Sequence, residues 1–289
     1  DVRWYTGTVD SSKNTSSVSY NSTDFSTFGK YYIDIYGMNM AGELVYLGGT
    51  TYTVDAPTEY DAYAASVMRN IIYAVETGGQ IYGNARYNDF TEAFTNSKTE
   101  RAITIGAGCW YATEARRLLT LIRQEDPELF ASLDTAEIGK DIDSADWTIY
   151  GSDGVVLSAD QTKEDGYSHR TITDGSPKAV AIQNIISTDV GIAIQDMLVE
   201  EQMAVYVEEA EELGVTDLKA RMFCANLRHL GGYGGMRRVI NNCKNEGLEL
   251  TMDNLWAVML KYDTGNQVGA PLYRTRHQKV MEWLNEYIG

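Results

Sequence analysis

One glutamate at the end of an apolar stretch is the residue of this chain best placed for acid–base chemistry. Glu76 lies in the segment Ala74-Val-Glu-Thr-Gly-Gly79, so two glycines follow it closely and leave room for a substrate. Apolar neighbours raise the pKa of a carboxyl by desolvation, and the carbonyl groups at a helix C-terminus disfavour a negative charge. We therefore predict that Glu76 is a general acid with a raised pKa. The alternative is a solvated residue in a helix cap.

The helix that must position Glu76 is predicted from the spacing of apolar residues. Between Tyr60 and Val75 they recur every three or four positions and so share one helix face, and Gly78-Gly79 ends the pattern. Further helices are predicted at about 113–125, 176–187, 191–212, 217–229, 255–259 and 273–287. A strand is predicted at 102–105, and the polar segment 150–175 is interpreted as a loop or small hairpin.

The residues that follow Glu76 form a pattern with a known parallel. A loop carries Tyr82 and Asp89, and the next segment reads Thr104-Ile-Gly-Ala-Gly-Cys-Trp-Tyr111. This order resembles the active-site region of phage-type lysozymes and their chitosanase relatives. The whole phrase is similar to the glycosidase domains of phage and prophage endolysins of Gram-positive bacteria. Residues 217–232 resemble the buried helix of that fold, and residues 273–284 its Arg-bearing closing helix.

The resemblance implies roles for three residues. Glu76 takes the place of the general acid, Asp89 that of the second carboxylate, and Thr104 that of a hydroxyl that positions the water or the second carboxylate. Cleavage of a glycosidic bond needs a proton for the leaving oxygen and a carboxylate on the other face. Because Asp89 lies in a polar loop, we predict that it stays ionised and that Glu76 has the higher pKa. Asp61, Glu92 and Glu100 are alternatives for the second carboxylate.

Aromatic and basic side chains near these positions are predicted to bind the substrate. Flat apolar faces with polar edges suit sugar rings, and the candidates are Tyr82, Tyr87, Trp110 and Tyr111. Arg228 and His229 precede the glycine-rich segment Gly231–Gly235, which we interpret as a hinge or a close-packing turn. These two residues are predicted to contact acetamido or lactyl groups, and the alternative is that they pair with acidic neighbours. Trp147, Trp256 and Trp283 are better explained as core residues.

Cys109 supports a rival interpretation. Gly108-Cys-Trp-Tyr111 is superficially similar to the nucleophile region of the cysteine amidase and endopeptidase domains that also occur in endolysins, with His169 and His229 available as bases. Such chemistry needs a thiolate beside an oriented imidazole, and neither histidine lies in a recognisable context of that kind. The alternative is a half-buried thiol that fills a gap. Cysteine and histidine show no metal-ligand spacing, so we predict neither a metal nor a cofactor.

Residues 1–56 differ in sequence pattern from the rest of the chain. Short alternating segments at 2–6, 31–36 and 50–54 predict strands, with turns at Met40–Gly42 and Gly48–Gly49. This part resembles the GBS Bsp-like repeat, a small β module of secreted and phage-derived wall hydrolases. The resemblance implies an Ig-like sandwich, truncated at its start. The pattern breaks at Asp55–Thr58, where we predict the domain boundary.

Composition excludes several classes of partner. The chain has 289 residues, with 24 Lys and Arg against 41 Asp and Glu, and a formal net charge of −17. An acidic chain without a basic run is a poor ligand for nucleic acid or for anionic membranes. No apolar run approaches the roughly 20 residues that span a bilayer, and the first residues do not show the pattern of a signal peptide.

The sequence therefore predicts an α+β, mainly helical lysozyme-like domain at 57–289 that follows a small all-β module. The implied function is a peptidoglycan hydrolase, secreted or released to the bacterial cell wall, that cleaves β-1,4 glycosidic bonds without a cofactor, with muramidase preferred. Three alternatives stay open. They are endo-N-acetylglucosaminidase or chitosanase-like cleavage on the same fold, a Cys109-dependent amidase or endopeptidase, and a non-catalytic wall-binding protein.

Overall fold

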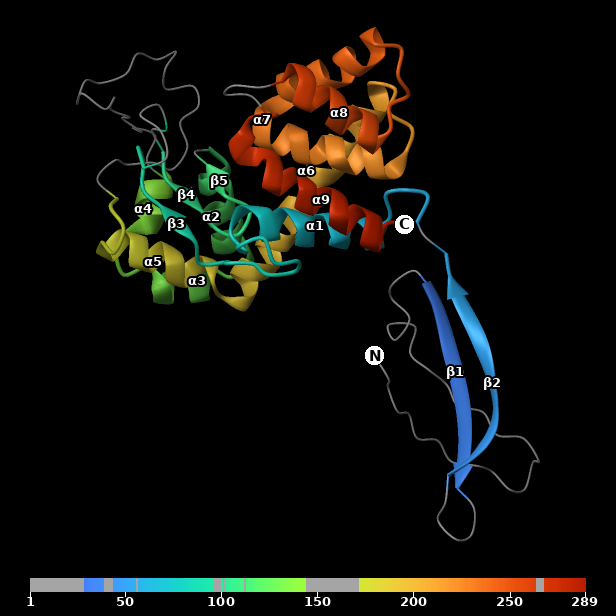
Figure 1. Ribbon diagram of the computed structural model, residues 1–289. Coiled ribbons are helices and arrows are strands. Elements are labelled where there is room, and N and C mark those ends of the chain that lie inside the picture. The colour runs from blue at the N-terminus through green and yellow to red at the C-terminus, as the bar shows by residue number, and fades with distance from the viewer. Residues whose placement is uncertain are drawn as a thin grey trace. The chain divides into compact units, whose positions relative to one another are not determined.

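The computed structural model describes residues 29–38, 44–55, 57–95, 100, 102–111, 113–143, 172–263 and 268–289. The chain divides into two compact units, one of residues 1–58 with Tyr287–Gly289 and one of residues 59–286. Helices predominate, and the described strands form two small antiparallel sheets (Figure 1). The predicted strand at 2–6, the turn at Met40–Gly42, Trp147, His169 and most of the predicted loop at 150–175 lie outside the described residues.

The first sheet is an antiparallel pair of β1 (Gly29–Met38) and β2 (Leu44–Val54). The strands predicted at 31–36 and 50–54 lie within it. The predicted turn at Gly48–Gly49 is wrong, because both glycines lie inside β2. Ile35 pairs with Gly48 and Tyr36 pairs with Tyr46, so Leu47 is an extra residue that makes a bulge. Gly48 has φ 149°, a conformation that favours glycine.

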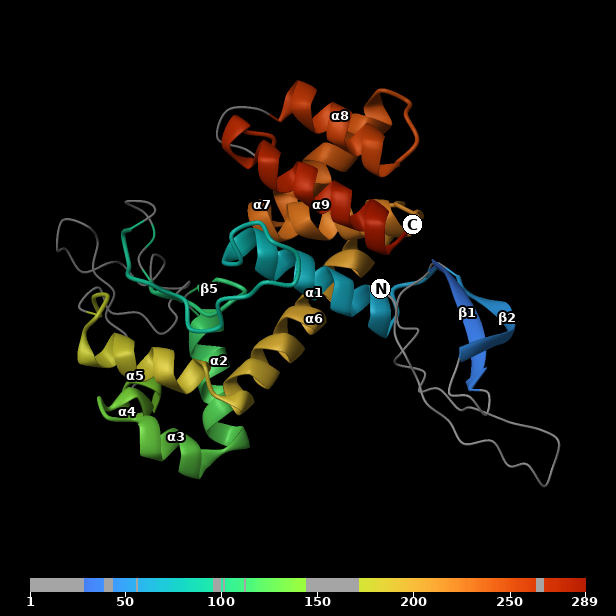
Figure 2. The same ribbon diagram turned by 60° about the horizontal axis from the view of Figure 1, so that its bottom comes forward.

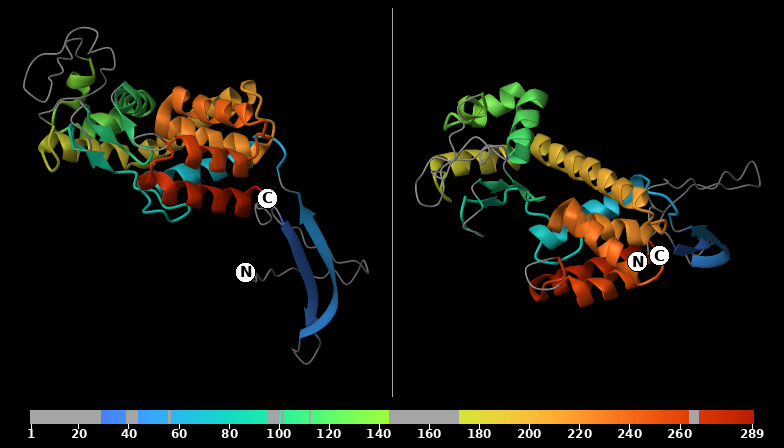
Figure 3. Two further views of the ribbon diagram at one scale, coloured as in Figure 1. Left: turned by 45° about the horizontal axis from the view of Figure 1, so that its top comes forward. Right: turned by 90° about the horizontal axis from the view of Figure 1, so that it is seen from above.

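The larger unit is arranged along one long helix, α6 (Asp189–Glu212). Figure 2 shows α2 and α5 near one end of α6 and α7 near the other, and Figure 3 gives the same arrangement from two further sides. The helices near its start are α2 (Thr113–Glu125), α3 (Pro127–Leu133), α4 (Ile138–Asp143) and α5 (Pro177–Ile186). The later helices are α7 (Leu218–Asn245), α8 (Met252–Tyr262) and α9 (Arg274–Tyr287), with a 3-10 turn at Pro271–Tyr273.

The second sheet has three very short strands in the order β3 (Phe90–Thr91), β4 (Thr104–Ile105) and β5 (Trp110–Tyr111). The predicted strand at 102–105 overlaps β4, whereas no strand was predicted at the positions of β3 or β5. Both ladders are antiparallel, with Phe90 opposite Ile105 and Ile105 opposite Trp110. The sheet therefore places the loop from Gly106 to Cys109 between two paired strands.

The helix predicted between Tyr60 and Val75 is confirmed as α1 (Ala62–Glu76). Asp61 caps its N-terminus by accepting a hydrogen bond from the backbone N–H of Ala64. Its apolar face is buried through Val67, Met68 and Ile71. Glu76 is thus the last residue of a helix that is anchored along its length.

The predicted glycine turn lies inside α7 rather than at its end. Gly232 has φ 68° and ψ 175° and interrupts the helix, which then continues to Asn245. A Cβ at Gly231 would lie 2.1 Å from Cγ1 of Val268, so this glycine allows close packing. The close-packing interpretation is confirmed, and the predicted helix end at residue 229 is wrong because the chain bends there and remains helical.

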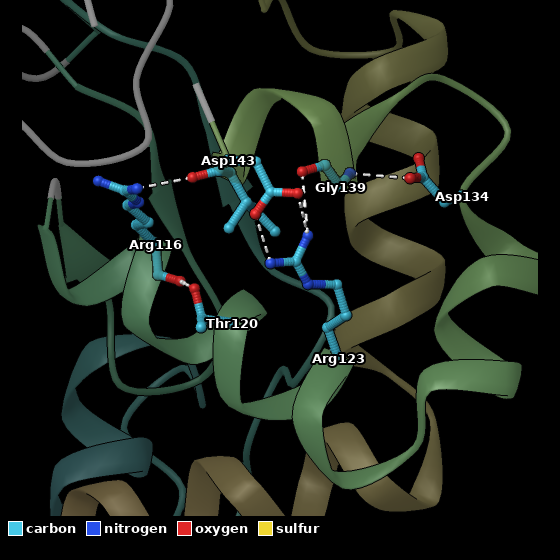
Figure 4. A network of polar contacts seen from close by, with 7 residues as sticks. Arg116, Thr120, Arg123, Asp134, Gly139 and Asp143 are labelled. Atoms are coloured by element: carbon cyan, nitrogen blue, oxygen red, sulfur yellow. Dashed lines mark hydrogen bonds and ion pairs between the residues drawn. The ribbon is translucent and has the colours of Figure 1, made fainter. Parts of the chain in front are cut away.

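Two short helices, α3 and α4, were not predicted from apolar periodicity, because few of their residues are buried. Side-chain hydrogen bonds tie α4 to α2 (Figure 4). Arg123 of α2 forms a bidentate pair with Asp143 at 3.0 and 2.7 Å and donates to the carbonyl of Gly139 at 3.0 Å. The carboxylate of Asp134 accepts from the backbone N–H groups of Ile138 and Gly139 and so caps α4. These contacts tie the connection after α2 back onto that helix.

Gly78 should be intolerant of any side chain. A Cβ there would lie 2.1 Å from the carbonyl oxygen of Asn84, while a Cβ at Gly234 would meet nothing within 4 Å. We expect Gly78→Ala to lower the free energy of unfolding by more than about 1 kcal/mol. Gly234→Ala should leave it unchanged or raise it by up to about 1 kcal/mol, because alanine is the better helix former. Urea unfolding followed by circular dichroism measures both, and equal stability of the two variants would contradict this packing.

Candidate active site

Glu76 meets two basic side chains that come from distant parts of the chain. Nη1 of Arg276, on α9, lies 2.5 Å from Oε1 of Glu76, and Nε2 of His229, on α7, lies 3.2 Å from the same oxygen. The exposed fractions of these side chains are 16% for Glu76, 9% for Arg276 and 12% for His229. We call these three residues the Glu76 cluster. It joins α1 to two later helices in a largely buried place.

The cluster reverses the predicted charge behaviour of Glu76. Burial alone would raise the pKa of the carboxyl, but Arg276 and His229 outweigh it and lower the pKa to about 2. The predicted raised pKa is therefore wrong. The apolar neighbours in the sequence indicated desolvation correctly, whereas nothing local indicated the two basic partners. In the free protein Glu76 is a carboxylate at neutral pH.

Asp89 lies in the loop before β3 and is only weakly paired. Nη2 of Arg86 is 3.6 Å from its Oδ1, and the Arg86 side chain is 66% exposed. Burial raises the pKa of Asp89, Arg86 lowers it and Asp174 raises it, with a net increase. The predicted order of the two pKa values is thus inverted, since Glu76 has the lower one.

Cys109 lies close to both carboxylates. Its pKa is raised, first by burial and then by the charges of Glu76 and Asp89, and its thiol hydrogen-bonds to Glu76. The residue has φ 54°, in the left-handed region, at the turn that leads into β5. A thiol in these surroundings stays protonated, which is the opposite of what a cysteine nucleophile needs. His229, one of its two predicted bases, is occupied by Glu76.

Thr104 contacts one of the alternative second carboxylates, Glu100. Its buried hydroxyl donates to Oε1 of Glu100 at 3.3 Å. Among the alternative carboxylates, Asp61 caps the far end of α1, about 20 Å from Glu76 at 1.5 Å per residue. Glu92 accepts from the backbone N–H of Asp174. Asp89 is the carboxylate whose charge, like that of Glu76, raises the pKa of Cys109.

The predicted aromatic residues mostly pack against protein. The hydroxyl of Tyr87 donates to Asp196 at 2.9 Å, and its ring lies edge-on to Tyr73. The ring of Tyr82 lies 5.8 Å from that of Trp283 on α9. Tyr111 belongs to β5. The predicted stacking of these aromatic rings on sugar rings stays a prediction.

The buried ring of Trp110 explains why the motif has glycine at positions 106 and 108. It is 4% exposed, and a Cβ at Gly106 or Gly108 would lie 3.0 or 2.9 Å from its indole ring. Its edge borders a pocket of about 300 Å³ between α2 and α6, together with Glu114, Arg117, Leu198, Glu201, Gln202, Val205 and Tyr206. The glycines therefore make room for a core tryptophan.

Arg228 and His229 are neighbours in sequence with different partners. Nε of Arg228 donates to Oε2 of Glu209 at 2.7 Å, and its guanidinium lies 4.4 Å above the ring of Tyr206. The alternative of pairing with an acidic neighbour is thus confirmed for Arg228. His229 also pairs with an acid, and that acid is Glu76 itself.

A buried glutamine that the sequence did not indicate fixes the loops of the site. Oε1 of Gln195 accepts from the backbone N–H of Ala107 at 2.8 Å, and its Nε2 donates to the carbonyls of Tyr87 and Ile186. Thr77, next to Glu76, donates to the carbonyl of Ala107 and accepts from the N–H of Arg86. Helix α6 and the C-cap residue of α1 thus hold the loop that carries Cys109 and the loop that carries Asp89.

Arg276 was also missed as an individual residue. Its only signal was the resemblance of residues 273–284 to an Arg-bearing closing helix, which named no partner for it.

Comparison with protein-family models, with curated proteins and with solved structures gave no match. Within the described ranges, no group of three or more His, Cys, Asp or Glu is arranged to hold a metal ion. No helix of that same part is long and apolar enough to cross a membrane.

The ion pair should govern the titration of Glu76. Since its folded pKa is below the usual value of 4.5, the pair stabilises the fold above about pH 4.5 and loses that contribution as the pH falls to about 2. Arg276→Met should raise the pKa of Glu76 by more than one unit, and Arg274→Met, an exposed neighbour on α9, should not change it. Carbon-13 NMR of the side-chain carboxyl measures both, and an unshifted Glu76 in folded Arg276→Met would refute the ion pair.

Cys109 should react slowly with alkylating reagents. Because burial and two carboxylates hold its thiol protonated, iodoacetamide at pH 8 should label it at least tenfold more slowly in the folded than in the urea-unfolded protein. Peptide mass spectrometry gives the rate for this cysteine alone. Labelling at the rate of the unfolded chain would show an accessible thiolate.

Proposed function

We propose that this protein is a glycoside hydrolase that cleaves the β-1,4-linked amino-sugar backbone of peptidoglycan, with the muramidase bond preferred. The observation that carries the proposal is a pair of carboxylates, Glu76 on a rigid helix end and Asp89 on a tied loop, whose charges both raise the pKa of Cys109. Two carboxyl groups on either side of one space are what glycosidic cleavage requires. The motif from Glu76 to Tyr111 supplies the substrate class by resemblance.

The geometry sets a condition on the acid role of Glu76. With a pKa of about 2, protonation at pH 6 costs roughly 5 kcal/mol, because each pKa unit corresponds to about 1.4 kcal/mol. Glu76 can donate a proton only if its contact with Arg276 loosens in the complex with substrate. Asp89, paired weakly with an exposed arginine, keeps a less compensated charge that suits stabilisation of an oxocarbenium-like state.

The contacts of Cys109 and Glu76 bear differently on two alternative functions. The Cys109 amidase is disfavoured by the raised pKa of its thiol and by the engagement of His229 with Glu76. A non-catalytic wall-binding protein is the second candidate, because a carboxylate bound by Arg276 and His229 also has the appearance of a purely structural ion pair.

Product analysis tests the proposal. Purified peptidoglycan is incubated with wild type, Glu76→Gln, Asp89→Asn and the control Glu125→Gln, which alters an exposed glutamate that also ends a helix. Soluble fragments are reduced with borohydride and identified by mass spectrometry. Wild type and control should release disaccharide-peptides, and Glu76→Gln should lower the rate at least about 100-fold.

Folding must be checked, because Glu76→Gln leaves Arg276 buried without its counter-ion at a cost of about 3–5 kcal/mol. The double variant Glu76→Gln/Arg276→Met removes that charge and should be folded and equally inactive. Muramitol ends would assign the muramidase bond and glucosaminitol ends the other bond of the glycan. Free amino groups without glycan fragments would move the chemistry to Cys109, and intact wall with bound protein would favour the non-catalytic candidate.

The pH profile separates the acid role of Glu76 from a base role. If Glu76 donates the proton, the raised pKa in Arg276→Met moves the basic limb of kcat/KM to higher pH. If Glu76 acts as an ionised base, the acidic limb moves instead. We expect the first result, and the second would overturn the assignment of Glu76 as the acid.

A further inference from the structure

A chain of buried hydrogen bonds lies behind the Glu76 cluster. Nε2 of His277 is 2.8 Å from the carbonyl oxygen of Val268, and its Nδ1 is 3.0 Å from Nδ2 of Asn226. Nε of Arg276 donates to Oδ1 of Asn226 at 3.1 Å. The same arginine contacts Glu76 through Nη1. The chain thus connects one backbone carbonyl to the candidate acid through three side chains.

The backbone carbonyl fixes the direction of every bond in this chain. A carbonyl oxygen only accepts, so Nε2 of His277 must carry the proton, and Nδ1 of the neutral ring must accept. Asn226 must then turn its amide NH₂ toward His277 and its oxygen toward Arg276. That orientation is the one an arginine Nε–H needs, since guanidinium has donors only.

Burial keeps the ring neutral. His277 and Asn226 are fully buried, and the rings of Phe223 and Trp256 lie about it at 5.9 and 6.1 Å. Burial lowers the pKa of His277 to about 4, with the hydrogen bond to Val268 opposing and the charge of Arg276 adding to the decrease. From α7 and α8 the ring thus meets uncharged groups, and the charge beside it is Arg276 on its own helix.

Arg276 depends on Asn226 for its position. Among the described residues its guanidinium contacts Glu76 and Asn226, and its Nη2 is buried with no hydrogen-bond partner. If Glu76 accepts a proton and loses the ion pair, Asn226 is the group that still holds the guanidinium. Without Asn226 the arginine would be free to follow Glu76 or to leave it.

We propose that Asn226 and His277 are positioning residues that hold Arg276 in place against Glu76 in both protonation states of the carboxyl. The importance of this arrangement for catalysis rests on the proposed function. The arrangement itself is open to test without any enzymatic activity.

The first test uses the unaltered protein. Long-range nitrogen-15 NMR at pH 7 should show His277 as the neutral tautomer with the proton on Nε2, and the ring should not titrate above about pH 5, since its pKa is about 4. The resonance is assigned by its loss in His277→Gln. A proton on Nδ1, or a charged ring at pH 7, would overturn the proposed direction of the chain.

The second test changes Asn226 and reads Glu76. Asn226→Ala removes the anchor of Arg276 and should shift the carboxyl titration of Glu76 by at least one pKa unit, a tenfold change in proton affinity. Asn241→Ala, an exposed asparagine on the same helix, should leave it unchanged. An unshifted Glu76 in folded Asn226→Ala would overturn the positioning role.

An isosteric variant keeps the proposal testable if Asn226→Ala does not fold. Asn226→Asp retains the acceptor for Arg276 but places a carboxylate beside Nδ1 of His277, so the pKa of His277 should rise by at least one unit. An unmoved His277 pKa would show that the two side chains do not interact. If these NMR shifts occur and wild type releases no glycan, the proposed function fails while the positioning role stands.

Discussion

The buried contact between Glu76 and Arg276 is the constraint on which the rest of the larger unit depends. It takes two charges out of water, which is costly unless each is well paired, and removal of one partner from such a pair typically costs about 3–5 kcal/mol. His229 adds a second donor to the same carboxylate oxygen. Helices α1, α7 and α9 must therefore meet at one point, and Gly231, two residues after His229, allows α7 to pack closely against Val268.

The surrounding loops are held to the same frame through single buried side chains. Gln195 of α6 binds the backbone beside Tyr87 and beside Ala107, and Thr77 binds the same Ala107 from α1. Asp89 and Cys109 are thus placed by helices that do not carry them. Asp89 on such a fixed loop has little freedom, and defined placement of a catalytic group is a condition for acid–base chemistry.

Local patterns in the sequence predicted local structure well. The apolar period before Glu76 predicted α1, and Ser176 and Ser187 bound α5 as its two caps. The turn predicted at Gly48–Gly49 was wrong because glycine fits a strand bulge as readily as a turn. The charge state of Glu76 could not be read locally, since its partners Arg276 and His229 come from other helices. The contact of Thr104 with Glu100, one of the alternative second carboxylates, could not be chosen from the sequence over a contact with Asp89 for the same reason.

A low resting pKa and an acid role are compatible only if one partner moves and the other does not. A bound glycan would exclude water from Glu76, and desolvation raises the pKa of a carboxyl. Protonation of Glu76 would, however, leave the buried guanidinium of Arg276 without its counter-ion, which costs free energy. If the guanidinium is anchored on Asn226, then the side-chain carboxylate of Glu76 is the group able to shift. Proton donation by Glu76 then requires a small movement of its carboxylate away from the fixed guanidinium of Arg276.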